Sequence, residues 1–220
     1  MKQDDYYRFP KEYFERQKQR TGFDPAVSGD WHKKFAIMIM KVFNPTRGRV
    51  LDVGCAMGAL VYQLYKLGID AYGVDISDYA IIYSPFSELK GRIFCRPSWN
   101  IDIWMDGWFR FVMSHQVLEH VPERYSEATI REMARLILPG DLIWVTLVTG
   151  NKGTNDSDWD PTHVNIQPKS FWQNIAKRVG LVDVSHMWLP TLYATTVNGM
   201  NFYETYRWDT FIWQKPVKRG

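Results

Sequence analysis

The stretch VLDVGCAMGALVYQLYKLGIDAYGVD, residues 50–75, decides the fold of this chain. It opens with an apolar, β-favouring run, and a short loop between Gly54 and Gly58 follows. Apolar residues then recur at helical spacing up to the next glycine, which is a common helix end. A second apolar run finishes at Asp75. The stretch therefore predicts a strand, a glycine turn, a helix and a second strand.

The two acids of this unit indicate a nucleotide-containing ligand. Asp52 and Asp75 are separated by close to the roughly 20 residues expected between a glycine turn and the acid that binds ribose hydroxyls. The alternative is a buried crossover whose glycines serve packing alone. Because the turn and both acids are in register, we expect an adenosine-containing cofactor across the ends of these strands.

The composition of the turn favours one cofactor over others. A dinucleotide site needs G-x-G-x-x-G, but the middle position here is Ala56, and Asp52 precedes the turn. A carboxylate there would repel a pyrophosphate and attract an ammonium group. S-adenosylmethionine carries an ammonium group and a sulfonium but no phosphate. The turn therefore favours S-adenosylmethionine and disfavours a nicotinamide-dependent oxidoreductase.

Four segments, two of which overlap the stretch above, carry a family resemblance. VLDVGCAMGAL, YGVDIS, FRFVMSHQVLEHVPE and ARLILPGDLIWVTLV occur in this order between about Val50 and Val148. They resemble successive motifs of class I S-adenosylmethionine-dependent methyltransferases, in particular type 11 and type 23 domains, and DPTHVNIQPKSFWQNIAKRVGL is loosely similar. The resemblance implies a Rossmann-like, mostly parallel sheet of seven strands, the last one antiparallel, with S-adenosylhomocysteine as product.

The remaining pattern agrees with an α/β, doubly wound fold. We expect residues 1–48 to form an N-terminal helical appendage and residues 49–220 the methyltransferase domain. The loop over 149–168 is long enough to be a functional lid. Helices are predicted over 6–19, 31–43, 78–83, 123–138 and 169–179, and further strands over 92–95, 109–114, 141–148, 181–188 and 209–213. Ser77 is the predicted N-cap of the third of these helices.

The resemblance assigns cofactor contacts to the strand ends. The turn should present the backbone of Gly54, Cys55 and Ala56 to the methionine part, with Gly58 closing it. Asp52 should orient the ammonium group, directly or through water. Beyond the second strand, two residues are expected on the adenosine, Asp75 on both ribose hydroxyls and Ile76 on the adenine face.

The adenine edge departs from the family pattern. Relatives commonly carry an acid after the third strand, where this chain has Ser98 followed by Trp99. Ser98 can still make a hydrogen bond, and Trp99 can stack on the base. Asp102 would take the position only after a shift of register. At the end of the fourth strand, Ser114 or His115 should approach the sulfonium.

Catalysis of methyl transfer requires alignment of the acceptor and exclusion of water, and a hydroxyl or amine acceptor also benefits from a base. His120, steadied by Glu119, is our first candidate, with His115 and His163 as further ones. The opposing interpretation is a loop histidine bonded to backbone, because the family often carries Leu-Glu-His here without catalytic use.

A metal-assisted alternative stays open. Gln116, Glu119, His120 and His163 resemble the two acids and two histidines of metal-dependent small-RNA 2′-hydroxyl methyltransferases. Gln116 replaces the first acid and is a poorer ligand for a hard cation. We therefore expect no metal, and His163 would then cap or close its loop.

Composition narrows the acceptor and the compartment. Aromatic residues make up 15% of the chain, and we expect those of the appendage and the long loop to favour a small-molecule or glycan acceptor with a ring-shaped face. These aromatic residues are Tyr6, Tyr7, Phe9, Tyr13, Phe14, Trp31 and Trp159. Packing in the hydrophobic core is the alternative explanation for part of the set. The net charge of +3 without a basic stripe argues against nucleic acid.

No secretory signal or membrane-length apolar run is present, and two cysteines do not suggest a disulfide framework. We expect a cytoplasmic monomer or homodimer. A cofactor-binding protein without transfer activity is the remaining alternative, suggested by Ala56, Ser98 and Arg110 at positions where the family usually has other residues.

Overall fold

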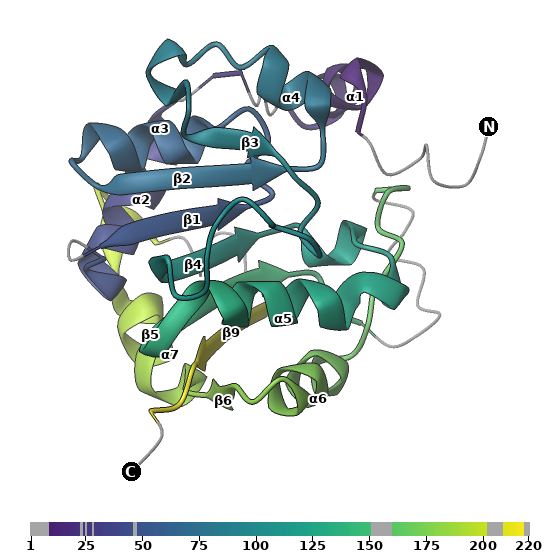
Figure 1. Cartoon of the computed structure of the whole chain (residues 1–220). Coiled ribbons are helices and arrows are strands. Elements are labelled where there is room, and N and C mark those ends of the chain that lie inside the picture. Colours follow the sequence, from purple (N-terminus) through teal and green to yellow (C-terminus); the bar gives the residue numbers. More distant parts are fainter. Residues whose placement is uncertain are drawn as a thin grey trace.

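A seven-stranded sheet forms the centre of the computed structural model, which describes residues 9–22, 24, 26–27, 29–45, 48–150, 160–201 and 209–217 (Figure 1). Its strand order is β3-β2-β1-β4-β5-β9-β6. All pairs are parallel except those that β9 makes with β5 and β6. This confirms the predicted doubly wound sheet with an antiparallel last strand. The strands are β1 (Arg49–Val53), β2 (Asp70–Asp75), β3 (Ile93–Cys95), β4 (Phe109–His115), β5 (Ile137–Leu147), β6 (Val182–Asp183) and β9 (Asp209–Gln214).

Helices cover both faces of the sheet. The α-helices are α1 (Lys11–Thr21), α2 (Asp30–Phe43), α3 (Ala59–Lys66), α4 (Asp78–Ile82), α5 (Ser126–Leu136), α6 (Lys169–Arg178) and α7 (Ser185–Ala194). Three short 3₁₀ segments, η2 (Ser87–Leu89), η3 (Leu118–His120) and η4 (Glu123–Tyr125), and a hairpin of β7 (Thr196–Val197) and β8 (Met200–Asn201) complete the described elements.

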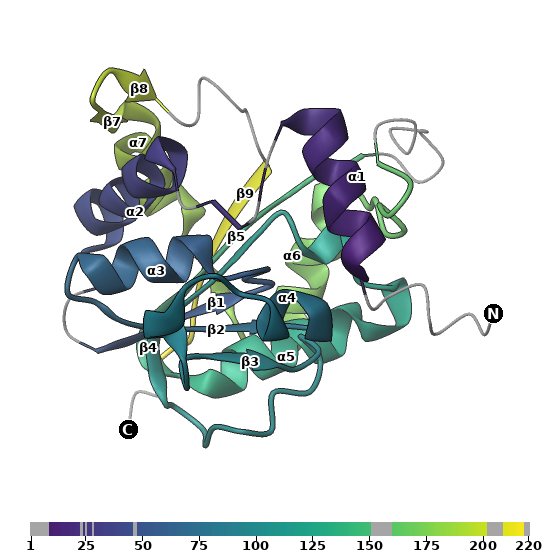
Figure 2. The same cartoon turned by 90° about the horizontal axis from the view of Figure 1, so that it is seen from above.

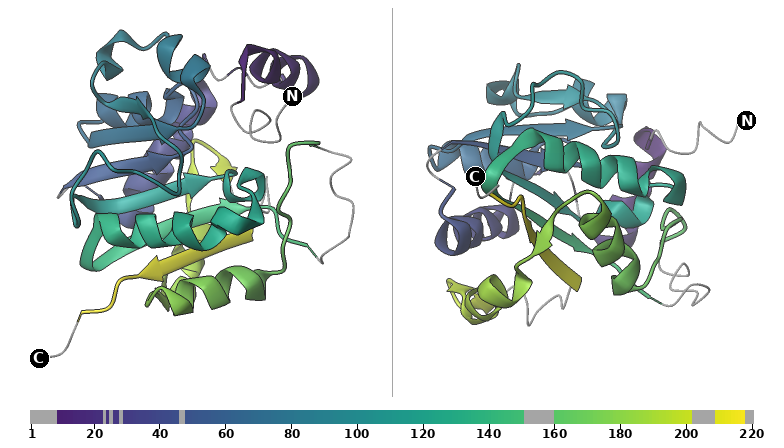
Figure 3. Two further views of the ribbon diagram at one scale, coloured as in Figure 1. Left: turned by 45° about the vertical axis from the view of Figure 1, so that its right-hand side comes forward. Right: turned by 60° about the horizontal axis from the view of Figure 1, so that its bottom comes forward.

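Two hydrophobic cores hold these layers together. Helices α2, α3 and α7 bury Phe35, Leu64 and Leu192 against one face, whereas α5 and α6 bury Ile130 and Trp172 against the other. Figures 2 and 3 show α2 and α3 on the opposite side of the sheet from α5 and α6. Burial of each large apolar side chain contributes about 1.5–3 kcal/mol, so the cores fix the sheet on which the site is built.

Two helix caps show how the sequence sets helix ends. The Ser77 side chain accepts a hydrogen bond from the Ala80 backbone N–H at 3.1 Å, which confirms it as the N-cap of α4. Helix α2 ends at Asn44, whose backbone lies in the left-handed region (φ 43°) and whose N–H donates to the carbonyl of Met40.

The strand predicted over 181–188 is mostly wrong. Only Val182 and Asp183 pair, with β9, and both are exposed at the sheet edge. The Asp183 side chain then accepts a hydrogen bond from the Ser185 backbone N–H at 2.9 Å, and α7 begins at that residue. A short apolar run fits either a strand or a helix, so the pattern alone did not separate them.

The boundary between α5 and β5 also differs from the prediction. The helix ends at Leu136, and Pro139 and Gly140 lie inside the strand instead of breaking the helix before it. Strand β5 already pairs at Ile137 with Phe109, and a shift in register before Phe111 accommodates the two residues.

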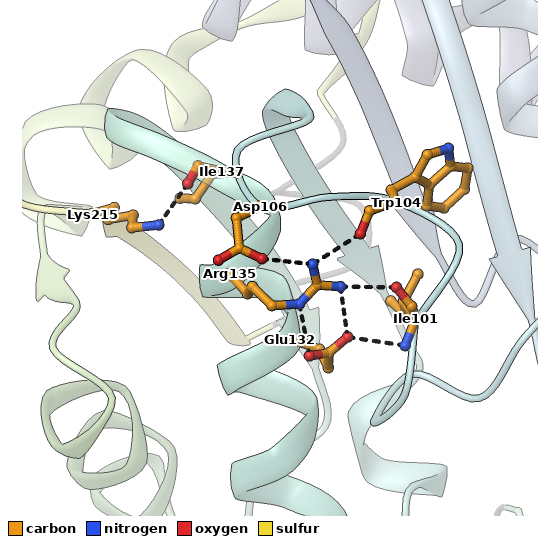
Figure 4. A network of polar contacts seen from close by, with 7 residues as sticks. All are labelled: Ile101, Trp104, Asp106, Glu132, Arg135, Ile137 and Lys215. Atoms are coloured by element: carbon orange, nitrogen blue, oxygen red, sulfur yellow. Dashed lines mark hydrogen bonds and ion pairs between the residues drawn. The ribbon is translucent and has the colours of Figure 1, made fainter.

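A polar network ties α5 to the segment before β4 (Figure 4). The Arg135 guanidinium donates to both carboxylate oxygens of Glu132, to the Asp106 carboxylate and to the carbonyls of Ile101 and Trp104, at 2.8–3.0 Å. Glu132 also accepts from the Ile101 backbone N–H at 3.0 Å. These five bonds match the five N–H donors of an arginine.

Candidate active site

A cavity of about 910 Å³ lies at the carboxyl ends of β1, β2 and β4. The turn after β1, the end of β2 and the segments after β3 and β4 form its floor, and α1, the start of α2 and residues 160–163 close it. Strand β1 lies between β2 and β4, so the strand order reverses at this point: β2 and β3 lie to one side of β1, and β4 and β5 lie to the other. Ligands of open α/β sheets bind at such a switch point.

Close approach of two loops explains Gly54. It has φ 85°, and a Cβ there would come within 2.2 Å of a Val117 methyl group. Only glycine therefore lets the turn after β1 meet the segment after β4. Ala56 also has a positive φ of 48°, a conformation that costs about 1–2 kcal/mol for a residue with a Cβ. Its N–H donates to the Asp75 carboxylate at 2.8 Å, which fastens the turn to the end of β2.

The other turn residues are divided between the cavity and the protein interior. Cys55 lines the cavity and packs against Gly73, where a Cβ would lie 2.6 Å from its sulfur. Gly58 is not among the lining residues. Its N–H donates to the carbonyl of Cys55 at 2.8 Å, and a Cβ would lie 2.7 Å from a methyl group of Leu89. Gly58 therefore shapes the turn from behind.

The two acids face one cavity. Asp75 accepts hydrogen bonds at 2.8 Å from the backbone N–H groups of Ala56 and Ser77, and burial raises its pKa against these bonds. Asp52 is 4% exposed, and burial together with the neighbouring Asp75 raises its pKa to about 7. Among the described residues, neither carboxylate makes a salt bridge. Such a pair favours a ligand that brings an ammonium group and hydroxyl donors.

Three further predicted residues lie on the cavity wall: Ile76 directly after β2, and Ser98 and Trp99 in the segment after β3. The Ser98 hydroxyl lies 3.1 Å from that of Thr129 in α5, and Trp99 stacks on Tyr125 with ring centroids 4.1 Å apart. The Ser98 hydroxyl and one face of Trp99 are thus already engaged. An adenine contact would use the remaining capacity of each.

At the end of β4 the two predicted residues behave differently. Ser114 is buried, does not line the cavity and donates to the carbonyl of Val53 at 3.0 Å, so it joins β4 to β1. Of the two residues predicted to approach the sulfonium, this leaves His115. His115 does line the cavity, with Nδ1 2.5 Å from the Thr146 hydroxyl, and burial with nearby His32 lowers its pKa to about 3.

The predicted catalytic residues come together beside η3. Ligand atoms of Glu119, His120 and His163 lie within 4.8 Å of one another, and both histidines line the cavity. Glu119 is fully buried and accepts from the Val148 backbone N–H at 3.3 Å. Its Oε2 has no hydrogen-bond partner in the described part of the chain. Burial raises the pKa of Glu119 to about 8.

A hydrogen-bonded chain that the sequence did not reveal leads from α1 to His120. Gln17 donates to the Asp160 carboxylate at 2.5 Å, and the other oxygen of Asp160 accepts from the Thr162 hydroxyl at 2.6 Å. Burial opposes ionisation of Asp160, but the bonds from Thr162 and Gln17 outweigh it and lower the pKa to about 2. The Thr162 hydroxyl and carbonyl oxygens lie 2.9 and 3.2 Å from His120 Nδ1. The only sequence signal was the turn-forming Asp-Pro-Thr.

Comparison with known proteins identifies the family. A family model described as "Methyltransferase domain" matches residues 9–186, most of the chain. The chain belongs to the class I S-adenosylmethionine-dependent methyltransferases. This methyltransferase is 31% identical over 108 residues to a ubiquinone biosynthesis O-methyltransferase of Bordetella avium, a match over 47% of this chain and 43% of the relative. A namesake from Albidiferax ferrireducens is 31% identical over 114 residues, 49% and 44% of the two chains. The matches span less than half of these relatives.

Solved structures share the fold of this methyltransferase. A phosphoethanolamine N-methyltransferase of Haemonchus contortus, in complex with S-adenosyl-L-methionine, has a TM-score of 0.61 at 16% identity, over 93% of this chain and 60% of its own. An S-adenosylmethionine-dependent methyltransferase of Archaeoglobus fulgidus has a TM-score of 0.60 at 18% identity, over 77% and 74%. The [4+2]-cyclase SpnF has a TM-score of 0.60 at 18% identity, over 84% and 81%.

S-adenosylmethionine is the cofactor of this methyltransferase, and the cavity fits it. In the part of the chain that the structure describes, the carboxylates of Asp52 and Asp75 make no salt bridge, and Gly54 and Ala56 of the turn line the cavity. Such a site suits an ammonium group and a ribose better than a pyrophosphate. Within the described residues, no helix has both the length and the apolar character needed to cross a membrane.

Proposed function

We propose that this methyltransferase methylates a hydroxyl oxygen of a small molecule or glycan with a ring-shaped face. The position of His120 on the cavity wall, held by the Asp160–Thr162 chain, is the observation that carries the proposal. The relatives in Bordetella avium and Albidiferax ferrireducens are named O-methyltransferases, which supports the oxygen acceptor. Aromatic side chains of α1 and α2 in the cavity wall, Tyr13, Phe14 and Trp31, support the ring.

The hydrogen bonds around His120 support Nε2 as its basic nitrogen. The Thr162 hydroxyl donates to the ionised Asp160, so its oxygen is an acceptor toward His120. The Thr162 carbonyl is an acceptor as well. Two acceptors at Nδ1 favour a proton on that nitrogen, which leaves Nε2 as the base. The carboxylate of Asp160 would then stabilise the imidazolium that forms, as the third member of a catalytic triad does.

The cofactor supplies, when bound, a methyl group already activated by its positive sulfur. The protein's task is to align the acceptor oxygen with that methyl group and to remove the hydroxyl proton. His120 Nε2 would take this proton as the acceptor oxygen gains the methyl group and the sulfur keeps the electron pair of the broken bond. A positioned base of this kind accelerates the reaction by about 10²–10⁴-fold.

Substitution of His120 tests the proposal. His120→Ala should cut the turnover number at least about tenfold, with the affinity for S-adenosylhomocysteine nearly unchanged, because a base acts in the transition state. His186→Ala, an exposed histidine of α7 outside the cavity, is the matched control. The measurement is transfer of labelled methyl groups from S-adenosylmethionine to a panel of hydroxylated rings. Normal turnover in the His120 variant would leave catalysis to alignment alone.

A metal-assisted ribose methylation is the second candidate, because Glu119, His120 and His163 gather their ligand atoms within 4.8 Å. An orphaned carboxylate oxygen on Glu119 fits a cation, whereas the lack of a basic stripe opposes RNA as acceptor. This candidate would be favoured if a chelator abolished activity, if Mg²⁺ or Mn²⁺ restored it, and if His163→Ala had no activity with either metal. Activity insensitive to chelator would exclude it.

A protein that binds the cofactor without methyl transfer is the third candidate. The solved structure of SpnF, a [4+2]-cyclase, shows that this fold is not confined to methyl transfer. Tight binding of S-adenosylhomocysteine with no labelled product from any ring acceptor would favour this candidate over the proposed O-methyltransferase.

A further inference from the structure

The cavity has a second end, under the start of α2. His115 ends β4 and is paired in register with Thr146 of β5, and Trp31 and His32 come from the first turn of α2. Because the strand order is β2-β1-β4-β5, this end lies on the opposite side of β1 from Asp75. Most contacts expected for the cofactor belong to β1, β2 and the segment after β3, and His115 is expected to approach only the sulfonium, so the end at β4 and β5 is available to the acceptor.

Flat rings build this end. We call Trp31, His32 and His115 the α2 wall, since all three line the cavity. Trp31 stacks on Phe35 with centroids 4.8 Å apart, and Phe35 lies 4.8 Å from His115. Trp31 also lies 5.8 Å from His115, with the two rings 31° from parallel. Phe35 is fully buried in the core, so it holds the wall in place without facing the cavity.

The α2 wall is polar but uncharged. Burial lowers the pKa of His32 to about 4, and burial with the proximity of His32 lowers that of His115 to about 3. Both imidazoles are therefore neutral at pH 7. The opposite end of the cavity differs, because it carries the carboxylates of Asp52 and Asp75.

This composition discriminates between acceptors. A phosphate or carboxylate group placed against neutral rings would lose its hydration without gaining an ion pair, which is costly, and an ammonium group would gain only a cation–π contact with Trp31. A sugar brings many hydroxyls that each need a partner, whereas the wall offers few, since His115 Nδ1 already faces Thr146. An aromatic ring instead gains contact with the faces of Trp31 and the imidazoles.

We propose that the α2 wall binds the acceptor and selects an uncharged, hydroxylated aromatic ring. The proposal rests on the O-methyltransferase function above and names its substrate class. The ring would lie against Trp31 and His115, with His32 at its edge. The hydroxyl would then point toward the part of the cavity lined by the turn after β1 and by His120.

Binding measurements test this without requiring turnover. The probes are catechol, benzoate, benzylamine and methyl glucoside, titrated into the protein saturated with S-adenosylhomocysteine and followed by ligand-observed NMR. Catechol should bind at least about tenfold more tightly than the other three, a difference of about 1.4 kcal/mol. Equal or tighter binding of benzoate, benzylamine or methyl glucoside would overturn the proposed substrate class.

Variants of His32 separate recognition from folding. His32→Ala should weaken catechol about tenfold, and His32→Gln, which keeps a neutral hydrogen-bonding group, should recover part of the loss. His32→Lys should reverse the preference in favour of benzoate, a change that a merely structural role would not produce. His186→Lys is the matched control on the exposed face of α7. Affinity for S-adenosylhomocysteine reports on folding in every variant.

Two results distinguish failure of this inference from failure of the proposed function. Unchanged probe selectivity in all His32 variants that still bind S-adenosylhomocysteine would overturn the α2 wall, whatever the protein methylates. Catechol selectivity that follows His32 as expected supports the wall, even if the transfer assay then shows that His120 is not the base.

Discussion

Two polar clusters flank β4, and they differ in how completely their hydrogen bonds are made. Around Arg135, all five guanidinium donors reach an acceptor (Figure 4). Around Glu119, the carboxylate is fully buried, makes no salt bridge among the described residues, and has one oxygen without a partner. The first cluster has the features of a structural tie. The second leaves a carboxylate oxygen without a hydrogen-bond partner among the described residues next to the cavity, as expected of a functional site.

The contrast extends to charge. Glu132 and Asp106 keep the pKa of Arg135 above its usual range, so this cluster is charged and paired at all ordinary pH values. Burial raises the pKa of Glu119 to about 8, so that carboxyl is mostly protonated at neutral pH and changes charge within the physiological range.

At a single neutral pH, breaking the Arg135 cluster should have the largest effect on stability. Arg135→Met should lower the free energy of unfolding by about 2–3 kcal/mol, because it leaves Glu132 and two carbonyl oxygens without their donor. Arg131→Met, in the preceding turn of α5, removes an exposed pair with Glu127 and should cost less than about 1 kcal/mol. Urea denaturation measures both. Equal losses would show that the network is no more stabilising than a surface ion pair.

The Glu119 cluster should appear as a pH dependence instead. In the unfolded chain a glutamate ionises near pH 4.3, whereas folded Glu119 keeps its proton up to about pH 8. Between these values the folded state binds more protons, so its stability falls as pH rises, by up to about 1.4 kcal/mol per pH unit, and levels off above pH 8.

Glu119→Gln should remove this contribution to the slope. The difference in unfolding free energy between the variant and the parent protein should shift in favour of the variant from pH 5 to pH 8. Urea titrations in the presence of a chelator measure it, and Asp52, which has a raised pKa of about 7, contributes to both proteins alike. Parallel pH profiles would mean that Glu119 is ionised in the folded protein.

A smaller effect is expected at the adenine end. Trp99→Ala should weaken S-adenosylhomocysteine binding by about 0.5–1.5 kcal/mol, through loss of an aromatic face. Ser98→Ala should weaken it less, since the Ser98 hydroxyl already shares a hydrogen bond with Thr129. Calorimetric titration gives both affinities. The reverse order would show that the segment after β3 had been aligned incorrectly with the family.

The sequence predicted the sheet and the βαβ unit because both depend on local patterns. Apolar runs, the positive-φ glycine at Gly54 and the Ser77 cap are each readable within a few residues. The edge strand β6 was not, because Val182 and Asp183 are exposed and carry no burial signal. A two-residue strand followed at once by α7 leaves no periodicity of its own.

The residues of the site were likewise predictable only where a local motif marks them. The motif positions of Asp52, Asp75 and His120 follow from their place at or after the carboxyl ends of strands, and the structure brings all three to one cavity. The roles of Gln17 and His32 depend on contacts between segments far apart in sequence, such as the bond from Gln17 to Asp160. Ser114 failed to face the cavity because alternate residues of a strand point to opposite sides, and its hydroxyl is used by Val53.

Asp75 is expected to hold S-adenosylmethionine in the cavity beside the turn after β1, whereas the Arg135 cluster is expected to be structural. Calorimetric titration of S-adenosylhomocysteine into Asp75→Ala, with Arg135→Met as the comparison, tests it most directly. We predict a loss of about 1.5–3 kcal/mol of binding free energy for the first variant and unchanged affinity for the folded second variant. An unchanged affinity in Asp75→Ala would contradict the assignment of the site.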